Sequence, residues 1–205
     1  MRLIGMLDSP YVRRVAVSLK FMGLPFSHES VSVFRHYDHF ASINPVVKAP
    51  TLVTDEGVVL MDSTLILDYA QRLAAPERRL ALAGLAGYAR GQRIVGLALA
   101  ACEKAVQIVY EHNLRPAEKR HQPWLDRVSG QLRTAWGLIE SEIGSENGWL
   151  CGQRILAPDI AVATAWSFCR SQSVVAEAMT GGYPAVGKFV ARAEALPEFL
   201  STAPD

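Results

Sequence analysis

The chain has 205 residues, half of them apolar, and 21 Lys and Arg residues nearly balance 20 Asp and Glu residues for a formal net charge of +1. This balance excludes the strong positive field of a nucleic-acid-binding protein. The three cysteines form no Cys-x-x-Cys pair, which argues against a disulfide framework and favours a reducing compartment. The longest apolar run, near residues 94–102, is too short to span a bilayer. We therefore expect a cytoplasmic protein without a membrane segment.

The first 33 residues predict a strand, a helix and a second strand. Residues 2–7 form a short apolar run with no signal-peptide character. Ser9 and Pro10 favour a helix start, because serine is a common helix cap. Proline fits the first helical position, where an N–H group would have no helical partner. Gly23 ends the helical pattern, and residues 26–33 alternate polar and apolar side chains. Two strands joined by a helix predict a parallel pair with a right-handed crossover.

Pro50 stands directly before a short β-type run. Proline cannot donate to a sheet ladder, so it belongs at the first residue of a strand. If the Ala49-Pro50 bond is cis, the main-chain groups of Ala49 face outwards and can pair with a peptide-like ligand. The residues 54–57 form a tight turn, so the strands before and after it are expected to be antiparallel.

Asp62 and Ser63 fall where the second hairpin strand gives way to a helix. A helix N-terminus presents unpaired N–H groups and a positive dipole end, which suits a carboxylate. Lys48 adds a cation nearby in the sequence. Asp62 and Ser63 also suit plain helix caps, and the two roles are compatible. Ser9 has the same alternative, since capping is the commonest role of serine before proline at a helix start.

The second part of the chain predicts helices only. Residues 74–79 are rich in Ala, Pro and charged residues, and no strand pattern follows them. We therefore divide the chain into residues 1–75 and 76–205. From residue 160 to 168 only two residues are polar, which indicates a helix buried in the middle of a domain.

The order of these motifs resembles the cytosolic glutathione S-transferases. Three segments carry the resemblance: Ser9-Pro10-Tyr11-Val12-Arg13-Arg14-Val15, then Asn44-Pro45 with Lys48-Ala49-Pro50-Thr51-Leu52, then Asp62-Ser63. The chain is most similar to bacterial members with serine in the active-site turn, over essentially its whole length. The resemblance implies a βαβαββα thioredoxin-like domain in residues 1–75, which binds glutathione. It also implies an all-α domain in residues 76–205, which forms the pocket for an electrophile.

The resemblance also implies a role for each candidate site residue. Pro50 would be cis, Ala49 would pair its main chain with the cysteinyl part of glutathione, and Asp62 with Ser63 would hold the γ-glutamyl end. Ser9 would be the catalytic residue and donate its hydroxyl to the glutathione sulfur. A thiol is a good nucleophile only as the thiolate, and a hydroxyl at a helix N-terminus favours that anion. The glycyl carboxylate would meet one of four candidates: Arg35, His36, His39 or Lys48.

The activity implied is a detoxifying glutathione transferase that adds the glutathione thiolate to small apolar electrophiles. Glutathione would be a co-substrate, no metal would be required, and the protein would be a homodimer. Tyr110 and Phe199 are candidates for lining the electrophile pocket. The alternatives are a non-catalytic glutathione-binding or protein-interaction scaffold, an isomerase or dehalogenase, and a reductase of mixed disulfides. The reductase usually needs cysteine in the place of Ser9.

Three positions depart from the family pattern. Val47 stands where the family usually has glycine, so we expect a different loop shape there. Asp62 replaces the more usual glutamate, and the shorter acid is expected to reach less far. Leu156 occupies a position that usually holds Ser or Thr as a helix cap, three residues before the retained Asp159. We expect a weaker helix start at that point.

Overall fold

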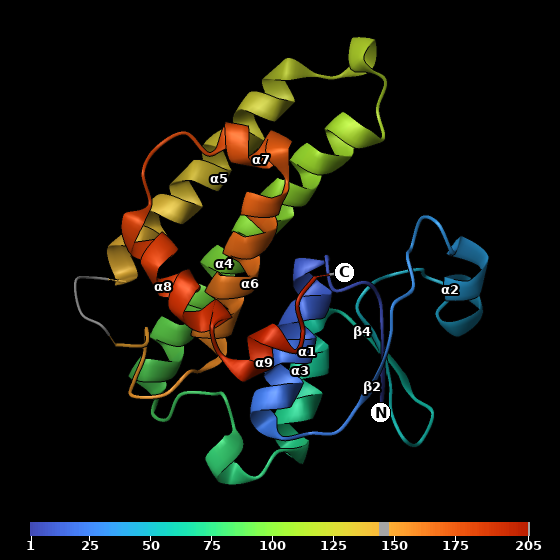
Figure 1. The fold of residues 1–205 in the computed structure, drawn as a ribbon, viewed down its shortest axis with the longest axis vertical. Coiled ribbons are helices and arrows are strands. Elements are labelled where there is room, and N and C mark those ends of the chain that lie inside the picture. The colour runs from blue at the N-terminus through green and yellow to red at the C-terminus, as the bar shows by residue number, and fades with distance from the viewer. Residues whose placement is uncertain (144–147, 205) are drawn as a thin grey trace. The chain divides into compact units, whose positions relative to one another are not determined.

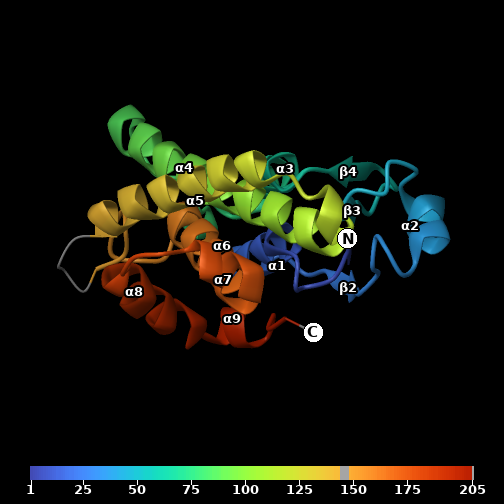
Figure 2. The same ribbon diagram turned by 90° about the horizontal axis from the view of Figure 1, so that it is seen from above.

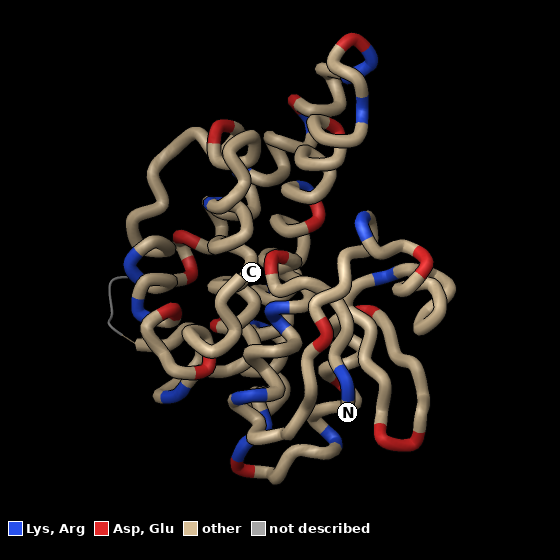
Figure 3. Tube along the Cα trace, turned by 45° about the vertical axis from the view of Figure 1, so that its right-hand side comes forward, with Lys and Arg blue, Asp and Glu red and all other residues tan. Residues whose placement is uncertain are grey.

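A computed structural model describes residues 1–143 and 148–204, and these residues form two compact units. The first unit contains residues 1–81 together with the C-terminal residues from 195, and the second contains the described residues between 82 and 194. Over the part of the chain that is described, no helix is both long and apolar enough to cross a membrane. Charges of both signs are interspersed along the chain in each unit (Figure 3).

The first unit is built on a four-stranded sheet in the order β2-β1-β3-β4. The strands are β1 (Arg2–Ile4), β2 (Ser27–Glu29), β3 (Thr51–Val53) and β4 (Val59–Met61). The predicted parallel pair of β1 and β2 and the antiparallel hairpin of β3 and β4 are both present. The first two strands are shorter than predicted, and β1 ends where Gly5 turns to a φ of 132°.

Helices cover both faces of this sheet. The α1 helix (Pro10–Met22) and the α3 helix (Ser63–Leu73) lie on one side, and α2 (Tyr37–Ile43) lies on the other (Figure 1). The buried ring of Phe40 in α2 packs with Ile4 of β1. A short 3-10 helix, η1 (Pro76–Arg78), follows α3.

The C-terminal segment packs on α1 of the sheet unit. Its last helix is α9 (Pro197–Leu200). The buried guanidinium of Arg13 donates from Nε to the carbonyl oxygen of Thr202 at 2.9 Å and lies over the ring of Phe199. Phe199 is fully buried by these contacts. The expectation that Phe199 lines an electrophile pocket is therefore wrong.

The second unit consists of helices. They are α4 (Leu85–Asn113), η2 (Ala117–Lys119), α5 (Gln122–Ile143), α6 (Ala157–Ser171), α7 (Ser173–Ala178) and α8 (Pro184–Glu194). Figure 2 shows α4 and α5 side by side along much of their length. The α6 helix packs against α4, α7 and α8, and its residues 158–165 are all buried. The prediction of a central buried helix is confirmed.

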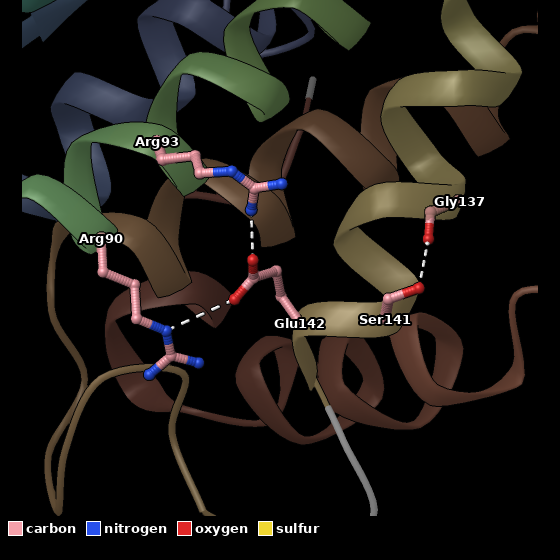
Figure 4. A network of polar contacts seen from close by, with 5 residues as sticks. All are labelled: Arg90, Arg93, Gly137, Ser141 and Glu142. Carbon is pink, nitrogen blue, oxygen red and sulfur yellow. Dashed lines mark hydrogen bonds and ion pairs between the residues drawn. The ribbon is translucent and has the colours of Figure 1, made fainter.

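An exposed ion-pair network joins α4 to α5 (Figure 4). Glu142 accepts from Arg90 Nε at 3.3 Å and also from Arg93 Nη1. At the preceding residue, the Ser141 hydroxyl donates to the carbonyl of Gly137, one turn earlier on the same helix, at 3.0 Å. Solvent-exposed ion pairs contribute about 0–1 kcal/mol each, so this network aligns the two helices rather than stabilising them strongly.

Candidate functional site

The strand register gathers the predicted site residues at one end of the sheet. Thr51, the first residue of β3, pairs with the last residue of β1 on one side and the last residue of β4 on the other. Gly5, Pro50 and Asp62 are the next residues beyond these paired positions. They therefore occupy neighbouring places at the same end of the sheet, where α3 begins.

Ser9 caps the N-terminus of α1. It has extended backbone angles, and its Oγ accepts from the main-chain N–H of Val12 at 3.4 Å, which is long for this type of bond. A serine hydroxyl has one donor proton and two acceptor lone pairs. The cap uses a lone pair only, so the proton of this half-buried hydroxyl remains available to a ligand.

The peptide bond between Ala49 and Pro50 is cis, as the resemblance implies. Pro50 is buried directly before β3, and Ala49 is half-buried. Across residues 1–143 and 148–204, no hydrogen bond to the main chain of Ala49 is found. Ala49 thus presents a free N–H and a free carbonyl at the end of the sheet.

Asn44 holds the loop that leads to Ala49. Its buried side chain accepts from Val46 N at 3.1 Å and donates to Thr51 Oγ1 at 2.9 Å. The Thr51 hydroxyl in turn donates to the carbonyl of Lys48 at 2.7 Å. The Lys48 side chain is exposed and forms no ion pair with any described residue. Asn44 had no predicted role of its own, although its side chain holds the shape of this loop.

Val47 has a φ of 52°, in the left-handed region that favours glycine. A β-branched residue in that region costs roughly 1–2 kcal/mol. The Val47 side chain packs against the buried cluster of Ile4, Val31 and Phe40, which offsets this cost. The departure at this position therefore adds an apolar contact under the loop.

The N-terminus of α3 carries Asp62, Ser63 and Thr64. Asp62 has a φ of 71°, and its Oδ1 accepts from Thr64 N at 2.9 Å. Ser63 is buried, and its Oγ accepts from Arg14 Nη1 at 3.0 Å. The same Nη1 lies 3.3 Å from Thr64 Oγ1. Arg14 was not predicted as a site residue. The available signal was the Arg13-Arg14 pair on α1, a helix that covers the sheet.

Three of the four residues proposed for the glycyl carboxylate lie in or just before α2. Arg35 Nη2 lies 3.4 Å from the sulfur of Met6. His36 Nδ1 accepts from Ser32 N at 3.3 Å, so this nitrogen is already occupied. His39 is exposed on α2. The geometry leaves the choice among these residues and Lys48 as a prediction.

A cavity of about 420 Å³ lies elsewhere on the same unit. The second half of α1, the loop after it and residues 201–202 line this cavity, and none of the six predicted site residues does. The cavity is therefore separate from the candidate site. No cluster of three or more His, Cys, Asp or Glu side chains suited to a metal ion occurs among the residues described.

Comparison with solved structures identifies the fold. A glutathione S-transferase from Methylobacterium radiotolerans, solved in complex with glutathione sulfonate, is 26% identical and superposes with a TM-score of 0.87 over 99% of this chain and 94% of that one. A maleylacetoacetate isomerase from Methylobacterium extorquens shares the fold at 19% identity, with a TM-score of 0.74 over 98% and 95% of the two chains.

The family assignment follows from comparison with sequence families. An uncharacterised glutathione S-transferase-like protein of Escherichia coli, YibF, is 26% identical over 85% of this chain and 84% of its own. The family model for the glutathione S-transferase N-terminal domain matches residues 3–78, and the model for the C-terminal domain matches residues 101–197. The chain belongs to the glutathione S-transferase family.

Proposed function

We propose that the sheet unit binds glutathione and that the protein transfers the glutathione thiolate to small apolar electrophiles. The observation that carries this proposal is the unpaired main chain of Ala49, at the sheet end that also bears Pro50 and Asp62. An extended peptide can add to such an exposed main chain through antiparallel hydrogen bonds. The cysteinyl residue of glutathione is the segment that would pair there.

The two ends of glutathione carry complementary charges for the flanking residues. The γ-glutamyl ammonium suits the Asp62 carboxylate, and the γ-glutamyl carboxylate suits the Ser63 hydroxyl at the N-terminus of α3. Lys48, next to Ala49 in the chain, is one of the four candidates for the glycyl carboxylate. Glutathione sulfonate bound to the Methylobacterium radiotolerans relative supports this class of ligand.

The proposed chemistry needs only a stabilised thiolate and an electrophile. The thiol loses its proton to solvent, the Ser9 hydroxyl would donate a hydrogen bond to the resulting thiolate sulfur, and the α1 N-terminus adds a favourable dipole. The thiolate then forms a bond to an electrophilic carbon, and the leaving group departs with its electron pair. Tyr110, the predicted contact for the electrophile, is 44% exposed on α4.

Replacing Ser9 by alanine tests this role. A hydrogen bond to a charged group contributes about 1.5–3 kcal/mol, so kcat/KM for a chlorodinitrobenzene should fall by about 10- to 100-fold. The pKa of the bound thiol, followed by thiolate absorbance, should rise by roughly 1–2 units. Ser9→Thr, which keeps a hydroxyl, is the matched control. Unchanged kcat/KM and unchanged thiol pKa in Ser9→Ala would show that the assigned role is wrong.

One observation favours a non-catalytic scaffold as the second candidate. Ser9 already accepts from Val12 N, so it has a structural role without any ligand. A scaffold predicts that Ser9→Ala loses about 1 kcal/mol of stability and nothing else. Calorimetric titration first tests whether the wild type binds glutathione at all. No binding supports a scaffold for other partners, and binding supports either the enzyme or a glutathione-binding scaffold. Turnover with the aryl halide then distinguishes these two.

We further propose a homodimer that forms through β4 and α3. β4 is an edge strand, and Val59, Met61 and Leu65 are 43%, 36% and 65% exposed on these two elements. An exposed apolar edge of this kind marks an association surface, and a second copy offers the same apolar face.

Light scattering should give twice the chain mass for the wild type and the single-chain mass for Leu65→Asp at micromolar concentration. The reason is that a buried, unpaired carboxylate strongly opposes association. The matched control is Leu200→Asp, which alters a leucine of equal exposure, 64%, on α9. A monomeric wild type, or a Leu65→Asp variant that stays dimeric, would contradict the proposed interface.

A further inference from the structure

We infer that Arg14 is a positioning residue that turns the hydroxyls of Ser63 and Thr64 into a paired donor site for the γ-glutamyl carboxylate. This inference rests on the proposed function of the same sheet end. Through Arg14, the α1 helix would help the start of α3 to bind a carboxylate. The sequence motifs did not assign Arg14 any role in binding.

The direction of the hydrogen bonds decides what the hydroxyls can do. Arg14 Nη1 donates to Ser63 Oγ at 3.0 Å and to Thr64 Oγ1 at 3.3 Å. A guanidinium has no acceptor, so each hydroxyl is held with a lone pair towards Arg14. Its proton must then point towards another acceptor. A carboxylate, which only accepts, is the ligand that such a pair of donors fits.

The charge of Arg14 strengthens these donors. Arg14 is 5% exposed and Ser63 is 3% exposed, whereas Thr64 is exposed at the surface. A guanidinium stays protonated in proteins, and its field is screened weakly in a buried setting. Hydrogen bonds in a chain polarise one another, so a hydroxyl that accepts from a cation donates more strongly. The buried charge thereby acts on a ligand that it need not touch.

Arg13 gives a contrast within the same helix. It is equally buried, at 3% exposed, but its guanidinium donates to the carbonyl of Thr202 and contacts Phe199. It therefore fastens the C-terminal segment. Arg13 and Arg14 are both buried cations on α1. Arg14 donates to residues at the start of α3, whereas Arg13 donates to the C-terminal segment, so the two arginines allow a positioning role to be compared with a structural one.

The experiment compares two ligands by calorimetry with the full chain. One is glutathione, and the other is glutathione with the γ-glutamyl α-carboxylate converted to an amide. We expect the wild type to bind glutathione more tightly than the amide by about 10- to 100-fold. Arg14→Gln should weaken glutathione binding by about 10-fold and amide binding by less than about 3-fold. Arg13→Gln, the matched control, should keep the full preference for glutathione.

The outcomes distinguish this inference from the proposed function. A wild type that binds neither ligand overturns the proposed function and, with it, the inference. A wild type that prefers glutathione, with the same preference in Arg14→Gln, overturns the inference alone. If Arg14→Gln does not fold, a double-mutant cycle of Arg14→Lys with Ser63→Ala replaces it. Losses of glutathione affinity that are less than additive support the coupling, and fully additive losses overturn it.

Discussion

Replacing Gly5 by alanine is expected to lower the free energy of unfolding by about 4 kcal/mol, with roughly 2 from backbone strain and roughly 2 from overpacking. Gly5 has a φ of 132°, a conformation that residues with a side chain rarely adopt. A Cβ atom there would lie 2.7 Å from Cγ2 of Val12 and 3.2 Å from Cβ of Ala49. Ala49 belongs to the candidate site and Val12 N donates to Ser9, so glutathione affinity should fall as well.

Gly57→Ala is the control for this experiment. Gly57 has a φ of 83° in the hairpin turn, and a Cβ there would meet nothing within 4 Å. Its substitution therefore adds backbone strain without a steric clash. Urea unfolding of both variants isolates the packing part as the difference between them. If Gly5→Ala is no less stable than Gly57→Ala, the contacts of Gly5 with Val12 and Ala49 do not exclude a side chain at residue 5.

The second large effect is the pH dependence that Asp159 gives to the helical unit. Asp159 is fully buried at the start of α6, and its two carboxylate oxygens accept from Leu150 N and Leu156 N, each at 2.8 Å. Burial raises the pKa of Asp159 from 3.8 to about 6, against the lowering effect of these two hydrogen bonds. Asp159 supplies one half of a capping box by accepting from Leu156 N, whereas Leu156 has no side-chain oxygen to accept from Asp159 N in return.

The sign of the effect follows from the raised pKa. The folded chain keeps the Asp159 proton to a higher pH than the unfolded chain does, so folding is favoured most below the unfolded pKa. This contribution is lost as the pH rises towards about 6. Between about pH 4 and pH 7, the wild type should lose about 2–3 kcal/mol of unfolding free energy relative to Asp159→Asn.

Urea unfolding at the two pH values measures this shift. Asp126→Asn removes a carboxylate from the exposed surface of α5 and controls for the loss of one negative charge. A difference between wild type and Asp159→Asn that stays constant over this pH range would show that burial does not raise the pKa of Asp159.

Local patterns were sufficient wherever a neighbouring residue decides the structure. Ser9 and Pro10 start α1, and Gly23, with a φ of 68°, ends it. The turn at residues 54–57 closes the hairpin, and the apolar run after Asp159 forms the buried α6. These features depend on caps, turn residues and hydrophobic spacing within a few positions of the chain.

Contacts between distant residues were outside the reach of such patterns. No spacing of residues predicted that Phe40 of α2 would pack beneath the sheet. Phe199 looked like a pocket residue, but Arg13 and the C-terminal segment bury it. The close approach at Gly5 likewise became visible only when Val12 and Ala49 were placed around it.

The amino-acid sequence by itself determined the family, the order of elements and the positions of Ser9, Pro50 and Asp62 at the boundaries of those elements. Only the tertiary structure decided that Arg14 reaches Ser63, 49 positions away, and that Asn44 shapes the loop before Ala49. The physical reason is that caps and turns are satisfied by neighbouring backbone groups. A buried charge or amide finds its hydrogen-bond partners wherever the packed elements bring them.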